Sequence, residues 1–160
     1  MYRKLAALVT SLFLFACAHT DITAHTDPSH LDFAVRGVAV ITVNTAHEVR
    51  TTANAYAVQA LKRHQVNAVV FDDVLPPTRE YTIEERRAAR AKWGYNAALY
   101  INIMPTQGKA QLIDSESQDI VWMADFSGDT GTYAYVDAGY IKTSVDAIIN
   151  ELVKAGHLPK

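Results

Sequence analysis

The seven-residue run Gly37–Val43 (GVAVITV) is the feature that most constrains the fold. It is β-branched and almost entirely apolar, so as a strand it has no polar face to turn toward water. Such a strand is typical of the interior of a sheet that is covered on both faces. A capping box at Thr45 and Glu48 follows it, and then comes an apolar stripe with helical spacing. The pattern predicts a strand and a crossover helix that leads to a parallel neighbour.

A second strand and helix follow. We expect the strand at about residues 68–71, ended by Asp72 and Asp73. Thr82 and Glu85 form a capping box, and the predicted helix runs to about residue 93, where Gly94 suits a left-handed cap.

The second half of the domain has a different period. Apolar and polar residues alternate over 99–104, and short turns separate this segment from two more strands, at 109–114 and 120–126. The last helix has an apolar face and ends at Gly156. The predicted order is β-α-β-α-β-β-β-α, a mixed α+β fold whose mixed parallel and antiparallel sheet is packed by three helices. The chain has 160 residues, about half of them apolar. Residues 35–160 can therefore form a single domain without a disulfide or metal.

The N-terminus has the pattern of a secretory signal peptide over residues 1–16. Arg3 and Lys4 are followed by an uncharged stretch of about a dozen residues, too short for the roughly 20 that a membrane-spanning helix needs. Losing these two cations changes the formal charge from −2 to −4, which gives no electrostatic reason to expect nucleic acid as a partner.

Cys17 is the only cysteine, so an internal disulfide is excluded. The sequence Leu14-Phe15-Ala16-Cys17 resembles the lipobox of bacterial lipoproteins. That resemblance implies cleavage before Cys17, acylation of its sulfur and amino group with chains such as palmitate, and attachment to membrane lipid. Ala18, which is not aspartate, favours the outer membrane, with the domain facing the periplasm. Two alternatives stay open: cleavage by ordinary signal peptidase, which would release a soluble periplasmic protein, and a cysteine inside a cytosolic core helix.

Residues 17–34 are polar, and we interpret them as the lipidated cysteine and a flexible tether. The string AHTD occurs twice here and His30 follows, so a transition metal is conceivable. The spacing matches no defined metal site, and a solvated linker is the favoured interpretation. We therefore expect no metal and no cofactor.

No nucleophile elbow, phosphate-binding loop or dinucleotide fingerprint is present, so no catalytic residue is predicted. Asp72 and Asp73 end a strand where a ligand could bind, although a loop-capping role is favoured. The segment 127–131 (SGDTG) could form a phosphate loop, although a mobile loop is favoured. Arg86 and Arg90 belong to a basic helix face that could bind an acidic partner or form surface salt bridges. Tyr133 and Tyr135 lie beside the Gly-containing loop and are further candidates for partner binding.

Three local motifs resemble the periplasmic domains of small bacterial envelope lipoproteins: the strand from Val38, the junction 91–101 (AKWGYNAALYI) and the hairpin that holds Trp122. Similar proteins in outline are the curli-secretion lipoprotein, the lipoprotein activators of penicillin-binding proteins and the N-terminal domain of the Tol-system propeller protein. Asn96 stands where that group more often has an acidic residue. The resemblance implies an envelope domain that binds other proteins and catalyses nothing.

Two functions follow from these patterns. The first is a lipid-anchored envelope lipoprotein that acts as a non-enzymatic protein-binding or assembly module with an envelope protein partner. The alternative is a small-molecule-binding or hydrolytic domain that uses the strand-end loops.

Overall fold

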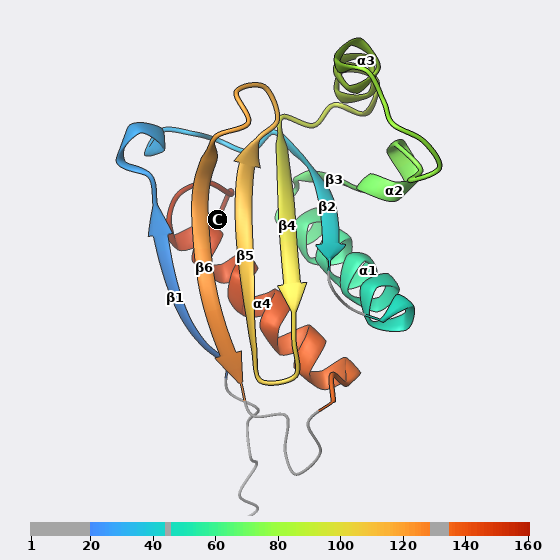
Figure 1. Ribbon diagram of the computed structural model, residues 1–160. Coiled ribbons are helices and arrows are strands. Elements are labelled where there is room, and N and C mark those ends of the chain that lie inside the picture. The colour runs from blue at the N-terminus through green and yellow to red at the C-terminus, as the bar shows by residue number, and fades with distance from the viewer. Residues whose placement is uncertain (1–19, 44–45, 129–134) are drawn as a thin grey trace, which may run out of the picture.

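The structure is a computed structural model and describes residues 20–43, 46–128 and 135–160 (Figure 1). The expected cap at Thr45 lies outside these ranges. The described elements, in chain order, are β1 (Thr20–Thr26), the short 3-10 helix η1 (Pro28–His30), β2 (Gly37–Val43), α1 (His47–Arg63), β3 (Asn67–Val70), α2 (Phe71–Val74), α3 (Ile83–Trp93), β4 (Ala97–Ile103), β5 (Gln107–Asp114), β6 (Ile120–Gly128) and α4 (Ala138–Lys154).

The strands form one six-stranded mixed sheet in the order β1-β6-β5-β4-β2-β3. β2 pairs in parallel with both β3 and β4, whereas β4, β5, β6 and β1 pair antiparallel with one another. The predicted fold class is therefore confirmed, with a parallel first part and an antiparallel meander. None of the helices in the described part of the chain is both long and apolar enough to cross a membrane.

Helices α1 and α4 cover the same face of the sheet (Figure 1). The core lies between them and the strands, and the predicted apolar face of α4 is buried there. Trp122 of β6 is 1% exposed and is thus a core residue. Fully burying one such side chain contributes about 1.5–3 kcal/mol. The opposite face of the sheet has no long helix laid along it as α1 and α4 lie along the first face (Figure 1).

The described residues 20–34 differ from the flexible tether that was predicted for residues 17–34. Residues 20–26 form strand β1, which pairs along its whole length with β6. Ile22 and Ala24 alternate with polar residues and pack against the core, which is the period-two pattern of an edge strand. The sequence does not predict this strand, because only two of its seven residues are apolar.

His157, just after α4, holds this segment in place. Its ring is 1% exposed, and Nδ1 donates to the carbonyl of Phe33 at 2.8 Å. Nε2 lies 3.4 Å from Thr26 Oγ1, and the Val35 amide donates to the His157 carbonyl at 3.0 Å. One buried imidazole therefore joins the chain on both sides of η1 to the C-terminal end of α4.

We predict that His157→Ala lowers the free energy of unfolding by about 2–4 kcal/mol, because it opens a cavity and leaves the Phe33 carbonyl unpaired. Urea denaturation followed by circular dichroism measures this change. His25→Ala is the matched control, since His25 is exposed on β1 and should change stability by less than about 0.5 kcal/mol. Equal effects of the two substitutions would contradict the role of His157.

Candidate functional site

Helix α3 buries none of its residues, unlike the other two long helices of the described part of the chain, α1 and α4. In Figure 1 it stands beyond the end of the sheet at which β2 and β4 begin. A helix without a buried apolar stripe must be positioned by its ends. Its predicted start is confirmed: Thr82 accepts from the Glu85 amide, and the Glu85 carboxylate accepts from the Thr82 amide.

An ion pair reinforces this start. The Arg79 guanidinium donates to both carboxylate oxygens of Glu85, at 2.6 and 3.0 Å. These bonds, with the amide of Thr82, lower the pKa of Glu85 to about 2. Arg79 also lies over the Tyr81 ring, at 4.2 Å from its centroid, and the Tyr81 hydroxyl donates to the Pro76 carbonyl.

The end of α3 is fixed as well. Gly94 adopts φ +69°, which confirms the predicted left-handed cap. Asn67 Nδ2, on β3, donates to the Trp93 carbonyl at 2.7 Å. The Arg90 guanidinium donates to the carbonyl of Ser115 in the β5–β6 turn. Polar bonds to β3 and to this turn therefore set the position of the helix.

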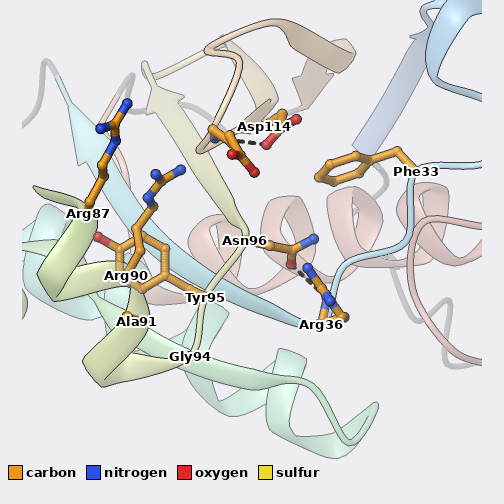
Figure 2. A pocket seen from close by; sticks show the side chains of 10 residues that line it. Phe33, Arg36, Arg87, Arg90, Ala91, Gly94, Tyr95, Asn96 and Asp114 are labelled. Carbon is orange, nitrogen blue, oxygen red and sulfur yellow. Dashed lines mark hydrogen bonds between the residues drawn. The ribbon is translucent and has the colours of Figure 1, made fainter. Parts of the chain in front are cut away.

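Two adjoining grooves lie along α3, and both are lined by Arg87, Arg90, Tyr95 and Glu116. The first, of about 570 Å³, extends toward the segment before β2, as Figure 2 shows. The second, of about 450 Å³, lies against the uncovered face of the sheet. Its apolar lining consists of Phe71, Leu75, Ile83, Ala98, Tyr100 and Ile113.

The grooves are positively charged. Arg36 and Arg87 form no ion pair with any carboxylate among the described residues, and Arg86 Nε donates to the carbonyl of Tyr81. Opposite them, Asp114 uses its carboxylate to accept from the β5–β6 turn, including the Glu116 amide at 2.9 Å. The guanidinium groups of Arg36 and Arg87 are thus available to an acidic partner.

Tyr95 forms a wall shared by the two grooves and is 7% exposed. Burial raises the pKa of its hydroxyl, and the positive charges of Arg90 and Arg86 oppose that rise. The hydroxyl therefore stays protonated at neutral pH and can donate a hydrogen bond.

Asn96 fixes the floor of the first groove. Its Oδ1 accepts from the amides of Arg36, at 2.8 Å, and Gly37, at 3.3 Å, while Nδ2 donates to the Ala34 carbonyl at 3.0 Å. An aspartate could accept both bonds but could not donate the third. An amide, and not a carboxylate, therefore satisfies all three bonds at this position.

The structure brings only part of the predicted site together. Arg86 and Arg90 both line the second groove. Tyr135 is 62% exposed and precedes α4, which begins at the end of the sheet away from α3 (Figure 1). Tyr133 and Cys17 lie outside the described residues. Arg36 and Asn96 were not recognised as groove residues from the sequence, because they come together only through the parallel pairing of β2 with β4.

The residues of the alternative strand-end site, Asp72, Asp73 and Ser127, do not come together in one place. Asp72 and Asp73 lie in α2 after β3, at one edge of the sheet, whereas Ser127 lies near the end of β6, next to the other edge. Four strand-to-strand steps of about 4.8 Å place β3 and β6 roughly 19 Å apart. Within the described residues, no group of three or more histidine, cysteine or acidic side chains could hold a metal ion.

We predict that Arg79→Gln raises the pKa of Glu85 from about 2 toward its ordinary value of 4.5. Because this pKa is lowered in the folded state, the stabilisation it gives is present above pH 4.5 and is lost as the pH falls toward 2. An NMR titration of the Glu85 carboxylate measures the change. Arg87→Gln, on the same helix but not bonded to Glu85, should leave the pKa where it is. An unchanged pKa in Arg79→Gln would contradict the assigned cause.

No family model matches the sequence, and no curated protein matches it. Solved structures of PelC from Paraburkholderia phytofirmans do match. A point variant crystallised as a dodecamer is 16% identical with a TM-score of 0.52, and the match covers 82% of this chain and 96% of that chain. A second PelC dodecamer is 14% identical with a TM-score of 0.52, and the match covers 89% of this chain and all of that chain. This chain is therefore similar to PelC in fold over most of its length.

Proposed function

We propose that the protein is a lipid-anchored, periplasm-facing envelope lipoprotein whose domain acts without catalysis as a self-associating assembly module. The observation that carries this proposal is the fold shared with PelC over 82–89% of the chain, since both PelC structures are dodecamers. The coverage of 96–100% of the PelC chains means that the likeness extends over nearly the whole PelC domain.

The N-terminal sequence supports the anchor. Leu14–Cys17 resembles a lipobox, and β1 begins at Thr20, three residues after Cys17. Three extended residues span about 10 Å, so acylation would hold the start of β1 close to the membrane. α3 stands at the opposite end of the sheet from the start of β1 (Figure 1). The grooves along α3 would then face the periplasm, where they can meet other proteins.

The groove chemistry supports binding over catalysis. The residues that line the two grooves along α3 include no histidine and no cysteine, and their cationic groups are arginines. Arginines hold their charge at all physiological pH values and suit the recognition of carboxylates. An open, arginine-rich groove beside tyrosines and an apolar strand face is a surface for a protein partner.

Acylation is tested by mass spectrometry of the mature N-terminus. We expect a diacylglyceryl adduct on Cys17 and recovery in the outer-membrane fraction, both lost in Cys17→Ser. Ala18→Ser is the matched control, because it keeps the cysteine and introduces no aspartate. A mature chain that begins at His19 without lipid would refute the anchor.

Assembly is tested by native mass spectrometry and light scattering of the full-length protein extracted in mild detergent. We expect a defined complex of several copies, because the proposal assigns self-association to the domain. A monomer at every concentration up to about 100 µM, far above the micromolar range of a weak protein complex, would refute the assembly function.

A further inference from the structure

Two exposed faces lie at the same end of the molecule, one beside each edge of the sheet (Figure 1). One is the side of α3 that lines the second groove; α3 follows β3, which lies at one edge of the sheet. The other surrounds η1, which follows β1 at the other edge. The two faces have opposite charge, and each carries a large exposed apolar side chain.

The basic face consists of Ile83, Arg86, Arg87 and Arg90. Ile83 is 64% exposed at the first turn of α3. Arg87 is one helical turn further on, so the two side chains share one side of the helix. None of the three arginines is paired with a carboxylate among the described residues.

The acidic face consists of Asp27, Leu31, Asp32, Asp119 and Ile120. Leu31 is 63% exposed and Ile120 is 41% exposed. Hydrogen bonds from the Ser29 side chain and amide lower the pKa of the Asp27 carboxyl, so it stays ionised. Asp32 has no ion-pair partner in the described part of the chain.

His30 joins the two parts of this acidic face. Its ring lies 3.7 Å from carboxylate oxygens of both Asp27 and Asp119. The Asp27 amide also donates to the Val121 carbonyl at 2.9 Å. These contacts place the start of β6 beside η1, so the Asp27 and Asp119 carboxylates lie close together, and Leu31 and Ile120 directly follow His30 and Asp119 in the chain.

We propose that the acidic face of one copy docks on the basic face of the next copy, so that the chains assemble head to tail. This inference rests on the proposed self-association and names its surfaces. The faces match in charge, and each supplies an isoleucine or leucine that a single copy leaves in water. Because the two faces differ, the contact is heterologous and repeats around a ring or along a filament.

The anchor is compatible with this arrangement. Both faces lie at the end of the sheet away from the start of β1, so neighbouring copies held at one membrane would present them at the same height (Figure 1). The contact can therefore repeat from copy to copy without detaching any chain from the lipid.

The test uses the full-length lipidated protein in mild detergent. Ile83→Asp with Arg87→Glu alters the basic face, and Leu31→Ser with Asp32→Lys alters the acidic face. All four side chains are exposed, and circular dichroism should show that both variants stay folded. The protein concentration is set at least tenfold above the midpoint of wild-type assembly. At this concentration the wild type is assembled, and we expect each variant to be monomeric. Lys62→Glu, an exposed charge reversal on α1, is the control and should assemble like the wild type.

Mixing the two variants gives the sharpest result. Each retains one intact face, so the mixture should form a heterodimer and nothing larger. Raising the NaCl concentration from 0.1 to 0.5 M should weaken this heterodimer, since screening reduces attraction between exposed charges.

The possible failures are distinguishable. If the wild type assembles and both variants assemble as well, the proposed pairing is wrong and the two faces bind a different partner. The assembly function then still stands. A wild type that never assembles would overturn both proposals. Variants that each form homodimers would show an isologous contact and would overturn the head-to-tail arrangement.

Discussion

The sheet has three parallel strands, and the way the chain connects them determines the rest of the structure. Parallel neighbours need a crossover connection, and helices normally cover a sheet face as they make it. The first connection, through α1, buries apolar residues against the sheet. The second runs through α2, which contacts β2 and β3, and through α3, which buries none of its residues and stays beyond the end of the strands. One sheet face is left open, and the grooves form where it meets α3.

Residues whose role is local made much of the fold predictable from the sequence. The capping box at Thr82 and the glycine at 94 mark the two ends of α3 correctly, because both depend only on nearby backbone groups. The apolar run of β2 and the face of α4 were identified by their period. The packing of α3 was not predictable in this way, since capping signals indicate where a helix begins and not what it contacts.

The N-terminal segment illustrates the opposite case. β1 pairs with β6, about a hundred residues further along the chain, and buries only Ile22 and Ala24 deeply enough to leave an apolar signal. Its position also depends on His157, which has no local pattern to reveal it. Arg36 and Asn96 are similar, because they meet across two strands that are parallel and distant in sequence. The basic side of α3 was visible in the sequence, whereas the grooves it lines were not.

The early start of β1 has a consequence for the behaviour of many copies together. A domain on a long tether would sample a thick layer of solvent and every orientation. With β1 beginning three residues after Cys17, acylated copies would be confined to a thin layer beside the membrane. Encounters then take place in two dimensions within that layer, which raises the effective concentration of the molecules without any new contact. A pairing too weak to persist in solution could thus hold on the membrane, so the lipid would regulate assembly as well as location.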